Sequence, residues 1–362
     1  MEKYSKWRDP STGVAPFLRP LPASTESLPP ALVYLAWPFK LALILVRVTL
    51  FVLLLLVQVT LCDGLLALLS FSPPLHYTLT RGVNAILCRA ILFVIGVGYI
   101  STETVSSKRT GGRATKKAPF EPKQGNLIVS NSSSWIDLVY LSFRHNATFL
   151  APVADSTTSS IVGWKCIALW QAIARSGQIP DKVDVKASEK GNGGKSLQEC
   201  AKTAAGPVVC FPECTTSNNR ALLRFADFAP SNSVAAATSF TGNVFVMAFK
   251  YPQPTRLSPS LTYPQPPSNS PWVLPFAHLS TLCSIPALYT FSIRRLDPTE
   301  SQTRFGSNAT SAPGNGATKT GRGLDWEGVG EAISTLGRFK RTAGLGWKEK
   351  EGFFEFRERK GR

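Results

Sequence analysis

The feature that most constrains this chain is a long apolar run at residues 41–61, whose only strongly polar members are Arg47 and Gln58. A helix needs about 20 apolar residues to cross the hydrocarbon core of a bilayer, so the run predicts a membrane helix. It starts well inside the chain, behind a proline-rich segment, and is too long for the apolar core of a typical signal peptide. We therefore expect this helix to be retained.

A second apolar run, at residues 85–100, is shorter and carries Arg89 near its start. It fits a second membrane span, a re-entrant segment, or a buried helix or strand of the domain that follows. Composition does not choose among these, so we expect one or two membrane helices.

The net charge of +17 on 362 residues makes two classes of partner candidates, namely nucleic acid and an anionic membrane surface. A basic cluster at residues 107–123 directly follows the second apolar run, with Glu121 as its acidic member. Such clusters favour the cytosolic side of a membrane and attract anionic headgroups by about 1 kcal/mol per charge. No nucleic-acid recognition motif accompanies the charge, so the sequence favours a membrane partner over nucleic acid. A solvated basic loop that binds nothing is the alternative.

The seven cysteines are scattered and form no CxxC pair, which is typical of reduced thiols in a cytosol-like compartment. No metal site is predicted, because the histidines lie far from any cysteine pair; they are His76, His145 and His278. Glycosylation sequons begin at Asn131, Asn146 and Asn308. We expect them to be unused, since the domain is predicted to face the cytosol.

Composition divides the chain into six segments. They are a disordered N-terminal arm (1–40), a membrane module (41–100), a basic linker (101–123), an α/β domain (124–300), a flexible linker (301–325) and a basic amphipathic tail (326–362). The tail forms either an interfacial amphipathic helix or a helix packed on the domain.

Strand-type runs alternate with helical ones in the central domain, which indicates an α/β fold. The expected strands are residues 126–131, 147–153, 206–213 and 243–251. The expected helices begin at residue 135 and cover residues 161–177. The proline-rich residues 251–271 are expected to form a loop that extends away from the core.

Two polar stretches follow predicted strands. NSSSWID (131–137) lies at a strand-to-helix junction, where free backbone N–H groups bind anions, and FPECTTSNNR (211–220) follows a second buried strand. Ligands collect at the carboxyl ends of strands in open α/β sheets. We therefore expect an anionic substrate, held by arginine and threonine, close to Asp137 and Glu213.

These stretches resemble a known family. VSNSSSWIDLVYL is similar to the first motif of the glycerolipid acyltransferases, typically N-H-x-S-x-x-D, and VVCFPECTTSNNRALLRF to their third, typically F-P-E-G-T followed in one branch by T-x-N-x-R-A-L-L. NVFVMAFKY resembles the fourth block. The layout is most similar to the fungal lysophosphatidic acid acyltransferases linked to the endoplasmic reticulum and lipid droplets.

The resemblance implies an acyltransferase-type domain with a mixed sheet flanked by helices, preceded by the membrane helices. It implies transfer of a fatty acyl group from acyl-CoA, as co-substrate, to lysophosphatidic acid or a related lysophospholipid, with no bound cofactor. It also implies a place in the endoplasmic reticulum membrane and on lipid droplets, with the domain in the cytosol.

The resemblance also implies site residues. In the family, the first-motif histidine takes the proton from the acceptor hydroxyl and the aspartate orients it. The matching catalytic positions are Asp137, Ser134 and Ser132, and Ser132 stands where the histidine would be. The matching substrate-binding positions are Asn131, Glu213, Thr215, Thr216, Arg220 and, for the poorly matched second motif, Arg175. Cys214 replaces the glycine of the third motif.

A serine hydroxyl is not a base near neutral pH, and a positioned base contributes about 10²- to 10⁴-fold in rate. His145, Asp137 raised in pKa by burial, or Cys214 as an acylated nucleophile are the candidate replacements. Alternatively, positioning and electrostatics carry a slow reaction. A different class of function is also open, that of a catalytically silent lipid-binding or scaffolding protein.

Overall fold

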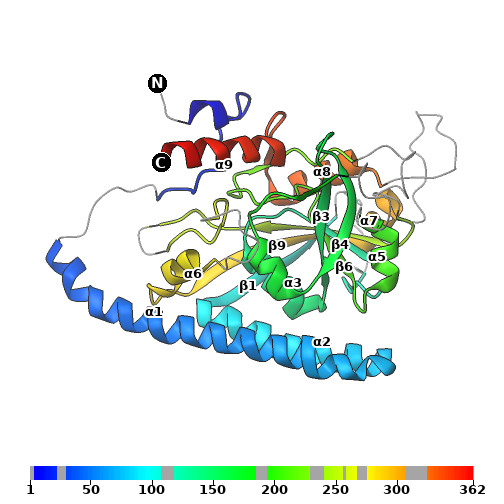
Figure 1. The fold of residues 1–362 in the computed structure, drawn as a ribbon, viewed down its shortest axis with the longest axis horizontal. Helices are drawn as coiled ribbons and strands as arrows, with labels where there is room; N and C mark the ends of the chain where they lie inside the picture. The colour runs from blue at the N-terminus through cyan, green and yellow to red at the C-terminus, as the bar shows by residue number, and fades with distance from the viewer. Residues whose placement is uncertain are drawn as a thin grey trace, which may run out of the picture.

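The computed structural model describes residues 4–22, 30–106, 118–184, 194–228, 240–255, 258–266, 275–306 and 324–361. Helices cover both faces of one mixed sheet, and a long helical hairpin lies along the domain (Figure 1). The predicted α/β class, with a mixed sheet flanked by helices and two apolar helices near the N-terminus, is confirmed.

The main sheet has eight strands in the order β1-β9-β8-β2-β6-β3-β4, with β5 paired to β3. The strands are β1 (Val97–Val105), β2 (Leu127–Ser130), β3 (Thr148–Asp155), β4 (Ile161–Ile167), β5 (Asp181–Val183), β6 (Val208–Cys210), β8 (Val244–Lys250) and β9 (Tyr289–Leu296). At the centre, β2 runs parallel to both β6 and β8, whereas β9 is antiparallel to β8 and β4 to β3. The carboxyl ends of β2 and β6, which carry the two polar stretches, therefore meet at one edge.

The central strands are buried on both faces, as near-continuous apolar runs predict. Along β2, Leu127 and Val129 face one core, whereas Ile128 faces the other. One core packs under α2 (Pro73–Ile95), α3 (Trp135–His145), α4 (Leu169–Arg175) and α6 (Phe276–Cys283). The opposite core packs under α5 (Leu197–Thr203), α7 (Pro298–Phe305) and α8 (Trp326–Gly337).

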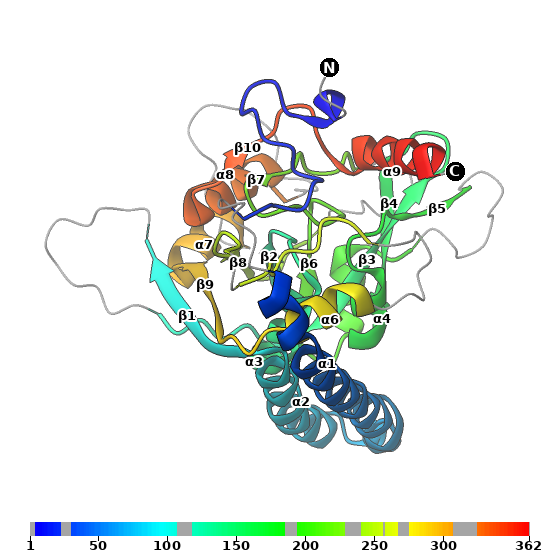
Figure 2. The same cartoon turned by 90° about the vertical axis from the view of Figure 1, so that its left-hand side faces the viewer.

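The first apolar run forms most of α1 (Pro30–Gln58). Two short helical turns (59–71) connect α1 to α2, and the two helices pack against each other. Both helices are long and apolar enough to cross a membrane. Figures 1 and 2 show them side by side along one edge of the domain. Arg47, the charged residue within the run, donates to the carbonyl of Ile285 at 3.0 Å, and Phe51 packs edge-on against Trp135. One face of α1 is thus held by the domain.

The domain is larger than predicted at both ends. The second apolar run ends α2 and then enters the sheet as β1, which pairs with β9, so residues 97–105 are not membrane module or linker. Residues 161–177 form β4 followed by α4 rather than one helix, because the β-branched and aromatic start pairs with β3. Parts of the predicted linkers, residues 107–117 and 307–323, lie outside the described residues.

The two ends of the chain are also part of the domain. Residues 4–22 pack against α9 (Trp347–Gly361) instead of forming the predicted disordered arm (Figure 2). Trp7 and Phe17 are buried against Phe353, because these aromatic rings remove enough apolar surface from water to order a proline-rich segment. Of the two alternatives for the tail, packing on the domain is the one observed.

Candidate active site

The first polar stretch forms a tightly capped start of α3. Asp137 accepts hydrogen bonds at Oδ2 from the backbone N–H groups of Ser133 and Ser134, at 2.9 and 3.0 Å. Ser134 is the N-cap, with its hydroxyl accepting from Ile136 N at 3.4 Å. This capping box fixes the turn between β2 and the helix.

The hydroxyl of Tyr251 donates to Oδ1 of Asp137. Asp137 is buried, and burial raises its pKa to about 7 although the three donors lower it. Both carboxyl oxygens are therefore occupied by groups of the protein, and Asp137 holds the turn from beneath.

Glu213 connects the two polar stretches. Its Oε1 accepts from Ser132 N at 2.8 Å and its Oε2 from Leu223 N at 3.0 Å. The side chain is fully buried, and burial raises its pKa to about 8, against the two backbone donors and nearby Lys350. Removing this carboxyl would release the loop after β2 from the loop after β6.

The C-terminal helix supplies a cation that sequence reasoning missed. Lys350 is fully buried, and its Nζ donates to Thr215 Oγ1 and to the carbonyl of Thr216, both at 2.8 Å. Burial lowers its pKa well below the usual lysine value. In the sequence, Lys350 is a lysine among Trp347, Phe353 and Phe354, and that apolar setting was the available signal for burial.

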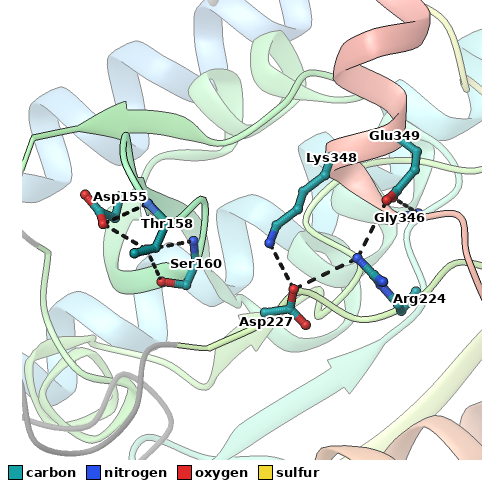
Figure 3. A network of polar contacts seen from close by, with 8 residues as sticks. All are labelled: Asp155, Thr158, Ser160, Arg224, Asp227, Gly346, Lys348 and Glu349. Atoms are coloured by element: carbon teal, nitrogen blue, oxygen red, sulfur yellow. Dashed lines mark hydrogen bonds and ion pairs between the residues drawn. The ribbon is translucent and has the colours of Figure 1, made fainter.

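Charged contacts hold the start of α9 beside the third motif (Figure 3). Lys348 pairs with Asp227 at 2.9 Å, and Arg224 lies 3.7 Å from Glu349. Glu349 also caps the helix by accepting from Gly346 N at 2.7 Å. These contacts fix the start of α9, so that Lys350 lies beside Thr215 and Thr216.

The loop after β8 bridges the same two motifs. Tyr263 N donates to the carbonyl of Ser133 at 2.8 Å, and the carbonyl of Tyr263 accepts from Thr216 Oγ1 at 2.5 Å. Leu261 and Tyr263 are buried. The prediction that residues 251–271 extend from the core is wrong for this part, because its backbone satisfies polar groups of both motifs.

A pocket of about 80 Å³ lies where these elements meet. Its polar lining includes Ser132, Ser134, Thr215, Thr216 and Arg175, which the sequence had placed in the site. Its apolar lining includes Leu138, Phe149, Leu150, Ala172 and Phe211, among others. The pocket therefore offers both polar and apolar contacts, which an amphipathic lipid substrate requires.

Three predicted substrate-binding residues do not line this pocket: Asn131, Arg220 and Glu213, the buried carboxyl described above. Asn131 is buried and clamps β8, donating to the carbonyl of Phe249 at 3.1 Å and accepting from its N–H at 2.8 Å. Arg220 is exposed and donates to Gln253 at 2.7 Å. Arg175 does line the pocket, where it pairs with Asp181 at 2.5 Å.

None of the three histidines lies at the pocket. His145 is eight residues beyond Asp137 on α3, about 12 Å along the helix axis. Burial, with the charges of three arginines, lowers the pKa of His145 to about 3. His278 accepts from Trp135 Nε1 at 2.9 Å, so its other nitrogen donates to the Ser260 carbonyl at 2.9 Å. His76 lines other cavities.

Cys214 lines the pocket but lacks the features of a nucleophile. Its side chain is buried, and burial raises the pKa of the thiol far above the usual value. Reactive cysteines have a lowered pKa. Its φ of 53° is in the left-handed region, which explains why a glycine suits this position in the family motif. Within the described residues, no group of three metal-ligating side chains was found.

Comparison with known proteins adds a relative that aligns along nearly the whole chain. A curated fission yeast (Schizosaccharomyces pombe) protein is 30% identical over 372 aligned positions, covering 99% of each chain. It is described, provisionally, as a lysophosphatidic acid:oleoyl-CoA acyltransferase. No family model matches the chain. No solved structure matches it. Since the similarity spans the whole chain, the protein belongs to the fungal lysophosphatidic acid acyltransferase-like family.

Proposed function

We propose that this protein transfers a fatty acyl group from acyl-CoA to lysophosphatidic acid or a related lysophospholipid. The observation that carries the proposal is the relative's similarity over 99% of both chains, including the segments that form the pocket. The pocket supports it, because its lining combines Arg175 and the two threonines with apolar side chains. Arg175 is the side chain that suits the phosphate of the acceptor.

In this reaction, the acceptor hydroxyl oxygen forms a bond to the thioester carbonyl carbon. The carbon–sulfur bond breaks, and the hydroxyl proton balances the departing thiolate. Acyl-CoA is the co-substrate and no cofactor takes part. Because no histidine lies at the pocket, positioning of acceptor and thioester by the linked motifs supplies the main rate enhancement. Glu213 and Lys350 are positioning residues, since they hold Ser132 and the threonines.

We place the protein at the endoplasmic reticulum membrane and on lipid droplets, with the domain in the cytosol. The hairpin supports membrane attachment, since α1 and α2 expose Leu45, Leu53, Leu56, Leu75 and Phe93, among others. Contacts of Arg47 and Phe51 hold α1 lengthwise against the domain, so the apolar face of the hairpin would enter the membrane beside the pocket.

The test is acyl transfer from labelled oleoyl-CoA to lysophosphatidic acid by the purified full-length protein. Ser132→Phe would fill the pocket and abolish transfer, whereas Ser132→Ala, which leaves the pocket open, serves as its control. No transfer by the wild type, in conditions where lysophospholipid binds, would refute the enzymatic proposal.

The missing base favours a second candidate function, that of a catalytically silent lipid-binding protein. Asp137 has a raised pKa, but its oxygens are occupied and it does not line the pocket. Under this alternative, Ser132→Phe abolishes lysophospholipid binding although the wild type shows no transfer.

A further inference from the structure

A second cavity, of about 890 Å³, lies between the first turns of α2 and the domain. Its lining also comes from the loop before β2, from the end of α3 and from the end of α5. It shares no lining residue with the pocket described above. The proposed acyl transfer assigns it no role.

The cavity collects positive charge from three separate elements. Arg81 comes from α2, Lys123 from the loop before β2 and Arg144 from the end of α3. Glu121 is the carboxylate in the lining. Among the described residues, none of the three cations forms an ion pair, so three positive charges face one carboxylate in the lining and leave an excess of positive charge.

A buried arginine stands behind this lining. Arg295 of β9 is 7% exposed, and its guanidinium lies 5.0 Å from the ring centre of Phe120, which lines the cavity. Its guanidinium donates to the neutral hydroxyl of Tyr140 at 2.6 Å, and its Nε has no partner. A buried charge without a counter-ion costs several kcal/mol, so a nearby anion would stabilise it.

His145 supplies a buried polar atom without a partner. The residue is 6% exposed, lines the cavity, and its Nε2 makes no hydrogen bond. Burial, followed by the charges of Arg295, Arg144 and Arg81, lowers its pKa to about 3, and Arg81 and Arg144 line the same cavity as His145. A neutral imidazole can donate one N–H to an oxygen anion.

The position of the cavity indicates the source of that anion. Tyr77 and Arg81 of α2 line the cavity. They lie on the same side of the helix as Cys88 and Leu92, which are buried against the domain. Leu75, Leu79 and Ile86 are exposed on the helix. The cavity therefore adjoins the surface that would enter the membrane.

We propose that this cavity binds the phosphate-bearing headgroup of an anionic membrane phospholipid, held by Arg81, Arg144 and His145. The proposal rests on the membrane association proposed above, but not on acyl transfer. An anionic headgroup satisfies the uncompensated charge, and its acyl chains continue along the apolar surface of α2. The phosphates of coenzyme A share the same chemistry and are the competing source.

The test measures binding of dioctanoyl phosphatidylinositol and of dioctanoyl phosphatidylcholine to the full-length protein in detergent by calorimetry. The double variant Arg81→Ala/Arg144→Ala removes two exposed cations of the cavity. The matched control, Lys165→Ala/Arg359→Ala, removes two exposed cations elsewhere and has the same net charge. We expect the cavity variant to bind phosphatidylinositol roughly 10- to 30-fold more weakly than the control, from about 1 kcal/mol per cation.

Phosphatidylcholine, which has no net charge, should bind both variants equally. Equal affinity of both variants for phosphatidylinositol would overturn the proposal. Loss of coenzyme A binding in the cavity variant, with phosphatidylinositol unaffected, would also overturn it and assign the cavity to the nucleotide. Because the readout is lipid binding, failure here is distinguishable from failure of the acyl-transfer proposal.

Discussion

The side-chain nitrogen of Lys350 donates a hydrogen bond of 2.8 Å to the hydroxyl of Thr215, a residue 135 positions earlier in the chain. The C-terminal helix is therefore part of the candidate site rather than an appendage of the domain. Since Glu213 links the third motif to the first, Lys350, Thr215 and Glu213 form one connected polar core beneath the pocket.

Lys350→Met tests this core directly. The variant keeps the length of the side chain but leaves Thr215 and the Thr216 carbonyl without their buried donor. Loss of such hydrogen bonds costs about 1–3 kcal/mol. We expect the free energy of unfolding to fall by that amount, and kcat/KM for acyl transfer to fall at least tenfold. Chemical denaturation and the labelled transfer assay measure the two effects.

Lys348→Met is the matched control on the same helix. Lys348 pairs with Asp227 at the surface, and exposed pairs contribute about 0–1 kcal/mol. If both variants lose stability and activity equally, the change reflects the docking of α9 as a whole, and a special role for Lys350 is refuted.

The buried carboxyl groups predict a pH dependence of stability. Asp137 and Glu213 have folded-state pKa values raised to about 7 and about 8, so the folded protein holds protons that the unfolded chain releases. Their contribution is complete below the ordinary carboxyl pKa values near 4 and is lost as pH rises through the folded values. We expect the contribution of these two carboxyls to the free energy of unfolding to fall between about pH 5 and 8.5, by at most about 1.4 kcal/mol per pH unit for each group. The lowered pKa values of Lys350 and His145 contribute in the opposite direction, so the carboxyl contribution is measured as the difference between the wild type and a variant.

Asp137→Asn separates the two contributions. The Asn carbonyl can accept from the N–H groups of Ser133 and Ser134, and its amide can donate to the Tyr251 oxygen. The decline between about pH 5 and 7 should become shallower, whereas the part near pH 8 should persist. Chemical denaturation at a series of pH values measures the free energy of unfolding of the wild type and of Asp137→Asn. If the two free energies change with pH in parallel, the raised pKa of Asp137 is contradicted.

The sequence predicted the elements that depend on local pattern. Residues 126–131 and 243–251 are short apolar runs bounded by polar residues, and both form central strands. The residues Ser132, Ser134, Thr215 and Thr216 meet in one pocket because they follow adjacent parallel strands. A rule of sheet topology was sufficient to bring them together.

The remaining parts depend on partners far away in the chain. The start of the 161–177 segment is a strand because β3 was available to pair with it, and no local pattern shows that. Lys350 is in the site because the aromatic residues of α9 dock against Trp7 and Phe17. The proline-rich composition of residues 1–40 predicted a disordered arm, since composition does not record burial against a distant segment.

The pairing of Tyr251 with Asp137 predicts how a general base could be restored. A histidine placed by Ser132→His needs an oxygen of Asp137, but the Tyr251 hydroxyl occupies Oδ1 and backbone amides occupy Oδ2. Ser132→His alone should therefore gain little, whereas Ser132→His/Tyr251→Phe frees Oδ1. We expect the double variant to approach the roughly 10²- to 10⁴-fold gain of a positioned base.

Tyr251→Phe alone is the control for that experiment, because it removes the same hydroxyl without adding a base. Initial rates with oleoyl-CoA and lysophosphatidic acid compare all three variants with the wild type. The prediction is refuted if the double variant is no faster than Ser132→His although it still binds lysophospholipid. In that case the Tyr251 hydroxyl does not prevent a histidine at position 132 from bonding to Asp137.

Arg175 and Arg220 were both predicted to bind substrate, and the structure separates them. Arg175 lines the pocket, whereas Arg220 is exposed and contacts Gln253. An arginine–phosphate contact is charge-assisted and is worth about 1.5–3 kcal/mol. Arg175→Ala should raise KM for lysophosphatidic acid at least tenfold, and Arg220→Ala should change it less than threefold. Steady-state kinetics in which Arg220→Ala has the larger effect would reverse the assignment.

Cys214 allows the backbone and the thiol to be tested at one position. Its φ of 53° costs an L-residue about 1–2 kcal/mol, and glycine does not bear this cost. Alanine loses the same sulfur contacts as glycine but keeps the strain. Cys214→Gly should therefore be more stable than Cys214→Ala by about 1 kcal/mol in chemical denaturation.

Both variants should retain acyl transfer, because a thiol that is buried with a raised pKa is no nucleophile. Loss of transfer in both, with the fold intact, would instead assign the acyl group to Cys214 as a covalent intermediate.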